Sequence, residues 1–585
     1  MRKVKIVCTL GPACGEPEKL RQLAEAGMNV ARFNFSHGDY EGHGRVLDMV
    51  RMIEKELKRP IATILDTKGP EIRTGRLEGH GEVQLKQGEI FSLCTDEFEG
   101  TAERVSISFA NLPKEISVGQ DIFIDDGVIR IKAETIEPNC ITCRVIVGGL
   151  LGERKGVNVP GADLSVPTLT EKDIKDIEWG IDRGMDYVAI SFVRQSEDIM
   201  RVREIIENYG CADRKINVIA KIETIQSVAN IEEIIRVVDG IMVARGDLGV
   251  EMPTEEVPMV QKRIIDLCRI HGKPVIVATQ MLDSMIRNPR PTRAEASDVA
   301  NAVLDGADAV MLSGETAGGK YPLEAVKTME RIVICTEREG KGRFSLPKEM
   351  RSASNVADSV SHAAMRVAEE MGAAAVLSLT RSGDTAAMVS KYRPGAMIIA
   401  STPLVSTWRA MCLMWGVKPI LEKEHGSSEE AVDAAIESIL AQGFVSAGDT
   451  VVITTGFPVF LSGTTNMLLI RTVGRVVLTS PSLIKRETAG HACIALNAAD
   501  AIECMEHGKI LVIKSSDKEY LPAMKKAIAI ITEEPGMANF TAMTALQLGI
   551  PCMSAADATN KITDGMMLTV DGVHGVVYEG RVKMK

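Results

Sequence analysis

The sequence has few aromatic residues, no excess of positive charge and no long hydrophobic run. Phe, Trp and Tyr make up 4% of the 585 residues, and the formal net charge is −11. The negative balance argues against a nucleic-acid partner, because such partners select a basic face. No apolar run approaches the roughly 18 residues of a membrane helix, and the first residues resemble a strand more than a signal peptide. We therefore expect no membrane association and a cytoplasmic location.

The 12 cysteines are scattered, and only Cys140 and Cys143 form a C-x-x-C pair. These two residues lie in a stretch of alternating polarity, where side chains three positions apart face opposite sides of a strand. No second pair accompanies them, as a four-thiolate zinc site would require. We expect reduced thiols without a metal or redox role.

Strand-like apolar runs alternate with amphipathic segments such as 17–26 and 47–57. At about 150 residues per domain, the length suggests about four domains. Strand–helix alternation predicts a parallel sheet, and eight repeats predict a closed (β/α)8 barrel. The eight runs are 4–10, 29–35, 61–67, 187–193, 217–222, 240–244, 274–279 and 309–313.

Several of these runs end in polar or charged residues. Lys221 and Glu223 are two positions apart, so both project to one side at the end of a strand, and Asp247 follows the next strand. A lysine beside two carboxylates can hold a divalent metal next to an anionic substrate; the alternative is a structural ion pair. The other strand ends carry Arg32, Asn34, Ser36, Asp66, Thr67, Thr279, Ser313 and Glu315.

Residues 69–164 interrupt the barrel pattern after the third strand. Short alternating runs and turns at Asp126-Gly127 and Gly148-Gly149 predict an antiparallel β domain. Arg73 and Lys155 lie near its two hinges, which favours a lid over a passive insertion. The barrel would then comprise residues 1–68 and 165–338.

Two further domains are predicted after the barrel. Residues 339–474 alternate strands and helices, as in a doubly wound α/β unit, and residues 475–585 form a small β-rich α/β domain. In the first of these, residues 380–385 join a strand to a helix with hydroxyls, a glycine and an arginine. Such a loop can bind phosphate at a helix N-terminus, or it can be an ordinary capped helix start.

Seven segments together resemble the pyruvate kinase family, in order, over about residues 1–474. They are ARFNFSHG (31–38), LDTKGPEIR (65–73), KGVN (155–158), AKIE (220–223), ARGDLG (244–249), ATQML (278–282) and MLSGET (311–316). The resemblance implies transfer of a phosphoryl group from phosphoenolpyruvate to ADP, giving pyruvate and ATP. It also implies a barrel, a β lid after strand three and an α/β effector domain.

The resemblance assigns a role to each matching position. Catalysis and binding of phosphoenolpyruvate would involve Arg32, Lys221, Gly246, Asp247 and Thr279, with Lys221, Thr279 and Arg32 catalytic. Mg²⁺ (or Mn²⁺) would be held by Glu223 and Asp247, and K⁺ by Asn34, Ser36, Asp66 and Thr67. The nucleotide would contact Asn34, Ser36, His37, Arg73 and Lys155. A glutamate at position 71 is typical of K⁺-dependent members.

The resemblance also bears on regulation. The effector loop of the family is matched by residues Thr380, Arg381, Ser382, Gly383, Asp384 and Thr385. We therefore expect activation by a sugar phosphate or a nucleotide monophosphate. The resemblance also implies a homotetramer. Residues 475–585 resemble the phosphohistidine domain of phosphoenolpyruvate-utilising enzymes. Phe540 occupies the position of the phosphorylated histidine, so this domain is expected to be structural or regulatory.

Two other functions share parts of this pattern. One is a metabolite sensor on the same scaffold with its chemistry lost, which the complete set of strand-end residues disfavours. The other is a Mg²⁺-dependent lyase that stabilises an enolate, which would need neither Arg73, nor Lys155, nor the K⁺ residues. Dependence on a nucleotide distinguishes this lyase from a kinase.

Overall fold

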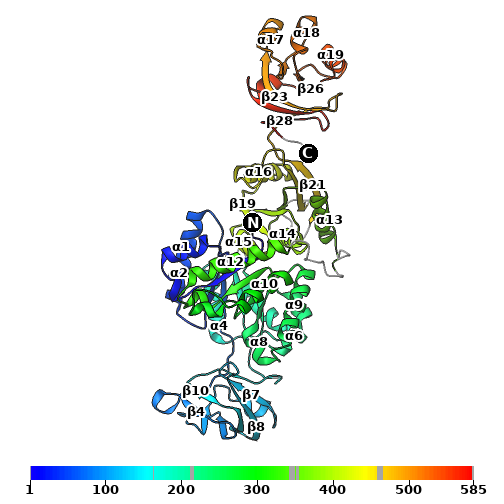
Figure 1. The fold of residues 1–585 in the computed structure, drawn as a ribbon. Helices are drawn as coiled ribbons and strands as arrows, with labels where there is room; N and C mark the ends of the chain where they lie inside the picture. Colours follow the sequence, from blue (N-terminus) through cyan, green and yellow to red (C-terminus); the bar gives the residue numbers. More distant parts are fainter. Residues whose placement is uncertain are drawn as a thin grey trace. The chain divides into compact units, whose positions relative to one another are not determined.

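The computed structural model describes residues 2–162, 164–210, 216–340, 350, 355–456 and 465–582 (Figure 1). The chain divides into two compact units. The first comprises Met1–Ser359, Thr380–Arg393 and Thr402–Leu421, and the second comprises Val360–Leu379, Pro394–Ser401 and Glu422–Lys585. This division does not test the four domain boundaries, which stay a prediction.

Eight parallel strands close into a barrel in the first unit, in the order β1-β16-β15-β14-β13-β12-β3-β2. Each predicted run contains one of these strands, so the predicted barrel is confirmed. The strands are almost entirely buried because helices cover them outside and apolar side chains fill them inside. They are β1 (Lys5–Thr9), β2 (Val30–Asn34), β3 (Ala62–Asp66), β12 (Tyr187–Ile190), β13 (Asn217–Ile222), β14 (Gly240–Ala244), β15 (Val275–Ala278) and β16 (Ala309–Leu312).

The helices of the barrel begin at the residue types expected of N-caps. Asp39 accepts a hydrogen bond from Gly42 at the start of α2, and Thr292 and Glu295 form a capping box at the start of α10. The helices are α1 (Pro17–Glu25), α2 (Tyr40–Leu57), α4 (Glu171–Asp182), α5 (Ser196–Asn208), α6 (Ile225–Ala229), α7 (Ile231–Val237), α8 (Arg245–Glu251), α9 (Val257–His271), α10 (Arg293–Asp305), α11 (Gly314–Ala317) and α12 (Pro322–Glu339).

The predicted β insert forms its own sheets between β3 and α4. A six-stranded sheet has the order β11-β7-β8-β9-β5-β6, and β10 pairs with β4. The pairing is antiparallel except between β5 and β6, which are parallel. Its elements are β4 (Val83–Leu85), β5 (Ile90–Cys94), β6 (Arg104–Ser106), α3 (Leu112–Glu115), β7 (Asp121–Ile124), β8 (Ile129–Glu137), β9 (Cys140–Val147), β10 (Gly149–Leu151) and β11 (Val157–Asn158). Because the insert leaves β3 at its carboxyl end, it joins the barrel at the edge where the polar residues gather.

The expectation of reduced thiols is wrong for four cysteines, which form the disulfides Cys94–Cys140 and Cys493–Cys504. The register of β5 and β9 places Cys94 directly opposite Cys140, with 4.1 Å between their Cα atoms. Such cross-strand neighbours cannot be read from spacing along the chain. Cys143 is a free, buried thiol, so the C-x-x-C pair is not closed.

The α/β domain contains a five-stranded sheet of order β19-β18-β17-β20-β21. Strands alternate with helices up to β20, as predicted for a doubly wound unit, and β21 follows as a strand antiparallel to β20. The elements are α13 (Val356–Glu370), β17 (Ala375–Leu379), α14 (Asp384–Lys391), β18 (Met397–Thr402), α15 (Val405–Ala410), β19 (Val417–Leu421), α16 (Ser428–Ala441), β20 (Thr450–Gly456) and β21 (Thr465–Thr472).

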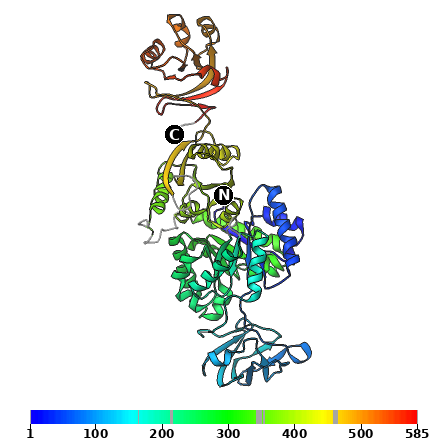
Figure 2. The same cartoon turned by 180° about the vertical axis from the view of Figure 1, so that it is seen from behind.

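The C-terminal domain is a mixed seven-stranded sheet of order β22-β28-β27-β23-β24-β25-β26. Its helices α17, α18 and α19 lie together on one side of the sheet in both views (Figures 1 and 2). The elements are β22 (Val476–Thr479), β23 (Glu487–Ala495), α17 (Ala498–Cys504), β24 (Ile510–Ile513), α18 (Leu521–Met524), β25 (Ala529–Thr532), α19 (Phe540–Leu548), β26 (Cys552–Ser554), α20 (Ala558–Lys561), β27 (Met567–Asp571) and β28 (Val576–Glu579). Among the described helices of the chain, none combines the length and apolar character needed to cross a membrane.

Candidate active site

A half-buried lysine lies at the centre of the polar edge of the barrel. The Nζ atom of Lys221, near the end of β13, lies 2.9 Å from Oε1 of Glu223 and 3.1 Å from Oδ1 of Asp66. It also donates a hydrogen bond of 2.7 Å to Oγ of Ser191. Burial alone would lower the pKa of Lys221, but the two carboxylates outweigh it and raise this pKa above its usual value. The structure therefore holds a charged ammonium between two carboxylates, with 12% of the lysine side chain exposed.

Asp66, at the end of β3, joins this lysine to Arg32. Nε of Arg32 donates to Oδ2 of Asp66 at 2.6 Å, and Nη1 of the same guanidinium donates to Oγ1 of Thr9 at 2.9 Å. Burial would raise the pKa of Asp66, but Arg32 and Lys221 together hold it below its ordinary value. Two cations thus share one ionised carboxylate, and both have further capacity to attract an anion.

Glu223 and Asp247 come from adjacent strands. Glu223 is 1% exposed, and its Oε2 accepts a hydrogen bond from the backbone N–H of Phe192 at 2.7 Å. Phe192 has a positive φ of 54°, which is uncommon for a bulky residue and marks backbone held in place by its surroundings. Asp247 follows β14 in the first turn of α8, and burial together with the charge of Glu223 raises its pKa to about 7. The positive charge of Lys221 opposes this shift but does not outweigh it.

Thr279, after β15, is fixed by its backbone and by its hydroxyl. Its φ is 66°, and its Oγ1 accepts a 2.7 Å hydrogen bond from the N–H of Gly246 while donating to the carbonyl of Ala278 at 2.7 Å. Arg245 braces the same turn, because its guanidinium donates to the Thr279 carbonyl at 2.8 Å and to Asp298 at 2.8 Å. Thr279 therefore lies against the N-terminal turn of α8, beside Asp247.

The four residues predicted for K⁺ lie on or just after the neighbouring strands β2 and β3, and the side-chain oxygen of Asn34 and the carbonyl of Thr67 already accept hydrogen bonds. Asn34 of β2 is in register with Asp66 of β3, and its Oδ1 accepts from the N–H of Ser36 at 3.1 Å. The carbonyl of Thr67 accepts from Ser191 at 2.8 Å. A cation at this place would have to replace or share these partners.

The two cations predicted at the lid hinges are brought to the same place. Residues Arg73 and Gly156 form an antiparallel bridge, so the two hinges run side by side. Arg73 pairs with Glu71 at 2.5 Å, and Nζ of Lys155 pairs with Oδ1 of Asp125 at 3.0 Å. Both side chains are thus held by lid carboxylates in the ligand-free chain. His37, also predicted to contact the nucleotide, is exposed at the turn after β2, and its carbonyl contacts the ring of His43.

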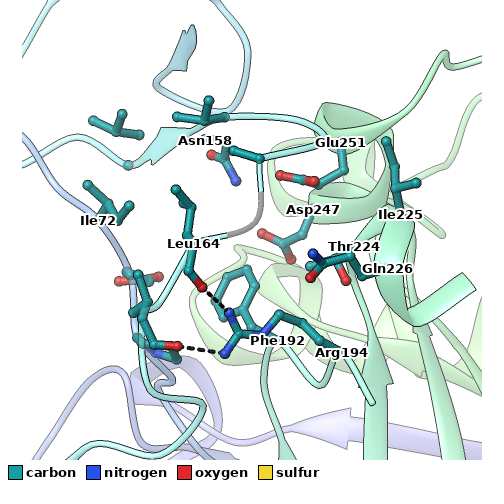
Figure 3. A pocket seen from close by; sticks show the side chains of 18 of the residues that line it. Ile72, Asn158, Leu164, Phe192, Arg194, Thr224, Ile225, Gln226, Asp247 and Glu251 are labelled. Carbon is teal, nitrogen blue, oxygen red and sulfur yellow. Dashed lines mark hydrogen bonds between the residues drawn. The ribbon is translucent and has the colours of Figure 1, made fainter. Parts of the chain in front are cut away.

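A cavity of about 260 Å³ lies between the base of the lid and the barrel (Figure 3). Ile72, Asn158 and Leu164 line it from the lid, and Asp247 and Glu251 line it from the barrel. Burial raises the pKa of Glu251 to about 7, against the opposing effect of a hydrogen bond from Asn158. The cavity reaches the predicted metal ligand Asp247, so it belongs to the same cleft.

Three residues of this region are absent from the sequence-based site: Ser191, Arg194 and Arg245. Each lies just after a barrel strand, and polarity at a strand end would have pointed to them. Figure 3 shows the guanidinium of Arg194 turned toward the backbone of the lid hinge, where it donates to the carbonyl of Leu164 at 2.6 Å. By contrast, Glu315 supports backbone, because it accepts from the N–H groups of Leu282 and Ser313.

The predicted effector loop, residues 380–385, is compact. Gly383 has a φ of 94°, which favours glycine, and its N–H donates to Oγ1 of Thr380 at 2.9 Å. Oγ of Ser382 donates to Asp384 at 2.7 Å, and the carbonyl of Arg381 accepts from Thr407 at 2.7 Å. The loop ends at the first turn of α14, where backbone N–H groups favour an anion.

In the C-terminal domain, Phe540 is the first residue of α19 and packs against the apolar core of this domain. The preceding Asn539 caps the helix by accepting from the N–H of Ala542 at 2.7 Å. Oγ1 of Thr541 donates to Glu534 at 2.5 Å. The helix start thus carries an aromatic ring, an internal cap and a nearby carboxylate.

Comparisons with known proteins match the whole chain. Residues 1–326 match the family model of the pyruvate kinase barrel domain, residues 358–471 match the pyruvate kinase alpha/beta domain, and residues 505–575 match the PEP-utilising enzyme mobile domain. The chain is 46% identical to a pyruvate kinase of Geobacillus stearothermophilus over 587 residues, with 100% of each chain covered. It is 45% identical over 588 residues to that of Bacillus licheniformis, again with 100% of each covered. A solved pyruvate kinase from Cryptosporidium parvum has a TM-score of 0.75 and 38% identity, and the match covers 81% of this chain and 96% of that one. The chain therefore belongs to the pyruvate kinase family, whose members are phosphotransferases that act between phosphoenolpyruvate and ADP.

Proposed function

We propose that the carboxyl edge of this barrel transfers the phosphoryl group of phosphoenolpyruvate to ADP, giving pyruvate and ATP. The observation that supports this most is the half-buried ammonium of Lys221, held charged by Asp66 and Glu223. Charge builds up on the oxygens around a transferring phosphoryl group, and a fixed cation stabilises it best where water is excluded. Arg32, on the other side of Asp66, supplies a second cation for the same group.

Glu223 and Asp247 fit a divalent cation, Mg²⁺ or Mn²⁺. Their oxygens are the hard ligands that Mg²⁺ prefers, and burial together with the neighbouring charge of Glu223 raises the pKa of Asp247. Among the residues that the structure describes, no group of three or more His, Cys, Asp and Glu side chains gathers as a metal site. Two carboxylates are nevertheless enough, since Mg²⁺ usually takes its other ligands from water and substrate phosphates. When bound, the metal would neutralise charge on the phosphoryl oxygens.

The N–H groups at the start of α8, from Gly246 and Asp247, would donate hydrogen bonds to the carboxylate of the substrate, which requires the Gly246 N–H to leave Oγ1 of Thr279. Thr279 lies against this turn, where the enol of pyruvate must gain a proton. Its hydroxyl donates to Ala278 in the ligand-free chain, so delivery of a proton requires this hydrogen bond to be exchanged for one to the substrate or to a water.

The lid would bring Arg73 and Lys155 to the phosphates of the nucleotide, with Asn34, Ser36 and His37 nearby. This requires Arg73 to leave Glu71 and Lys155 to leave Asp125. The negative phosphates of the nucleotide would replace these carboxylates as the partners of the two cations. Glu71 then remains as a fixed negative charge beside the site, which a K⁺ ion held by Asn34, Ser36, Asp66 and Thr67 would balance.

We further propose that residues 380–385 bind a sugar phosphate or a nucleotide monophosphate that activates the enzyme. The loop offers hydroxyls and the N-terminal turn of α14 to a phosphate. A homotetramer and a cytoplasmic location are expectations that follow from the family. The C-terminal domain carries Phe540 in place of a phosphorylatable histidine, so its role is structural or regulatory.

The first experiment measures pyruvate formation from phosphoenolpyruvate and ADP with Mg²⁺, with and without K⁺. Wild type should turn over with K⁺ stimulation, and Lys221→Met should lose about 10³-fold in kcat, as expected for a lost charge stabiliser. Lys175→Met, an exposed lysine on α4, is the matched control and should behave as wild type. Thermal unfolding of each variant separates lost chemistry from lost folding.

The alternatives predict other results. A lyase that stabilises an enolate would act without ADP, and a catalytically silent sensor would give no pyruvate under any ion condition while still binding phosphorylated metabolites. Full activity in a folded Lys221→Met enzyme would contradict the role of this lysine.

A further inference from the structure

A small cavity lies at the amino-terminal end of the barrel, opposite to the catalytic edge. It is formed where the end of α9 and the residue before β16 meet the last turns of α14 and Arg393, all within the first unit. Its volume is about 10 Å³, which is room for one species the size of a water molecule. Arg269, Lys273, Asp308, Lys391 and Arg393 line it, so four of its five ionisable side chains are cationic.

Arg269 is 4% exposed, yet most of its guanidinium lacks a partner. Among the described residues, none accepts a hydrogen bond from its Nε or Nη2. Its nearest carboxylate is the exposed Asp266, 3.9 Å from Nη1. Burial and then the positive charge of Arg393 lower the pKa of Arg269 to about 10. A buried cation in this situation is costly unless an anion approaches it.

Arg393 faces the same cavity and is only partly satisfied. Its Nη1 donates to Oδ1 of Asp308 at 3.0 Å and its Nη2 to the carbonyl of Gly306 at 2.9 Å, but its Nε has no acceptor among the described residues. Both arginines contact Gly306: Arg393 donates to its carbonyl, and the side chain of Arg269 packs against its Cα atom. A Cβ atom there would lie 3.0 Å from Cδ of Arg269, so glycine permits this close approach.

The carboxylates near the cavity are already used. Asp308 accepts from Arg393, from the N–H of Trp415 at 3.0 Å and from the N–H of Val275 at 3.1 Å. Asp358 pairs with Lys391 at 2.5 Å. Apart from the exposed Asp266, no carboxylate of the described residues lies within 4 Å of the guanidinium of Arg269.

We propose that this cavity binds a halide-sized monovalent anion, held by Arg269 and Arg393. The volume excludes phosphate and sulfate, which are several atoms across. A water molecule would fit, but it cannot compensate the guanidinium charge of Arg269, since Asp308 is already paired with Arg393. The anion would fasten the end of α9 to the segment after α14, and α14 begins at the predicted effector loop.

The direct test is a crystal of the full-length protein soaked in sodium bromide. We expect an anomalous peak in the cavity next to Nε of Arg269 in wild type and none in Arg269→Met. In solution, replacing 100 mM gluconate by 100 mM bromide should raise the midpoint of thermal unfolding by about 2 °C in wild type. This rise should persist in Arg263→Met, which removes an exposed arginine from the same helix, and should vanish in Arg269→Met.

Two results would overturn the proposal. One is a cavity that holds water without anomalous signal in bromide. The other is a bromide peak without any halide-specific stabilisation in solution, which would mean binding at crystal concentration only. Arg269→Lys keeps one charge with fewer donors, so a reduced but measurable bromide response in this variant would support the proposal if Arg269→Met fails to fold.

Discussion

The lid should depend on Arg194, which ties its second hinge to the barrel. The guanidinium donates to the carbonyls of Leu164 and Val166, each at 2.6 Å, and reaches Oγ1 of Thr168 at 3.3 Å. Its backbone N–H is held in turn by Asp198 at 2.9 Å. Replacement of Arg194 by Met keeps the apolar stem and removes every one of the guanidinium donors.

The size of the effect follows from these contacts. A hydrogen bond from a charged donor contributes about 1.5–3 kcal/mol when buried. Leu164 and Val166 are only half-buried, so water can donate to their carbonyls after the substitution and recover much of this free energy. We therefore take about 2 kcal/mol as the loss for the hydrogen bonds of Arg194 together, the hinge clamp. At 1.4 kcal/mol per tenfold, the closed hinge becomes about 30-fold less favoured. We expect kcat/KM for ADP to fall by about 10- to 30-fold.

Initial-rate kinetics and hydrogen exchange of the hinge check this prediction. Exchange of residues 164–168 should quicken in Arg194→Met, while the midpoint of thermal unfolding changes little, because few core contacts are lost. Arg194→Lys should fall between the two, since one ammonium cannot bridge both carbonyls as a planar guanidinium does. Arg201→Met, an exposed arginine on the neighbouring helix α5, is the control and should match wild type.

An Arg194→Met enzyme with normal kcat/KM for ADP and unchanged exchange at the hinge would refute the reasoning. Slower turnover together with a large loss of thermal stability would also count against it, because the clamp would then serve the fold of the barrel and not the position of the lid.

Three further predictions concern ions, the effector and pH. Glu71→Lys should make activity independent of K⁺, measured by titrating K⁺ at constant ionic strength; an unchanged requirement would contradict the proposed balance of charge. Arg381→Ala combined with Ser382→Ala should abolish activation by phosphorylated effectors and leave basal turnover intact, and wild-type activation would show that the effector binds elsewhere. Burial lowers the pKa of Lys5 to about 8 from its ordinary value of 10.5, so the folded chain releases this proton at lower pH than the unfolded chain. The free energy of unfolding should therefore rise between pH 8 and pH 10.5, by about 3 kcal/mol, and Lys5→Met should remove this rise in denaturant unfolding curves.

The barrel could be predicted because its signal is local. Each strand is a short apolar run, and each polar residue at its carboxyl end follows directly in the sequence, so the pattern alone could place Lys221, Asp66 and Asp247 on one edge. Ser191 and Arg245 also follow barrel strands, but the sequence-based site does not include them. Their roles depend on hydrogen bonds to residues of other strands, from Lys221 to Ser191 and from Arg245 to the carbonyl of Thr279.

Contacts between distant segments could not be predicted. The Cys94–Cys140 disulfide depends on the register of β5 with β9, which no spacing along the chain encodes. The parallel pairing of β5 with β6 breaks an otherwise antiparallel domain for the same reason. The hinge clamp of Arg194 is a further case, since its acceptors are backbone carbonyls that have no side-chain signature.

The balance of charge at the catalytic edge connects the fold to the proposed chemistry. Two cations, Arg32 and Lys221, lie among three carboxylates, Asp66, Glu223 and Asp247. Asp66 is paired with both cations and Glu223 with one, whereas burial and the charge of Glu223 raise the pKa of Asp247. A barrel selected only for stability would not place a carboxylate such as Asp247 here without a cation partner, because removing an unpaired carboxylate from water weakens the folded state. A divalent cation between Glu223 and Asp247 would be this partner and leave the edge positive toward a phosphoryl group, which is the condition that phosphoryl transfer requires.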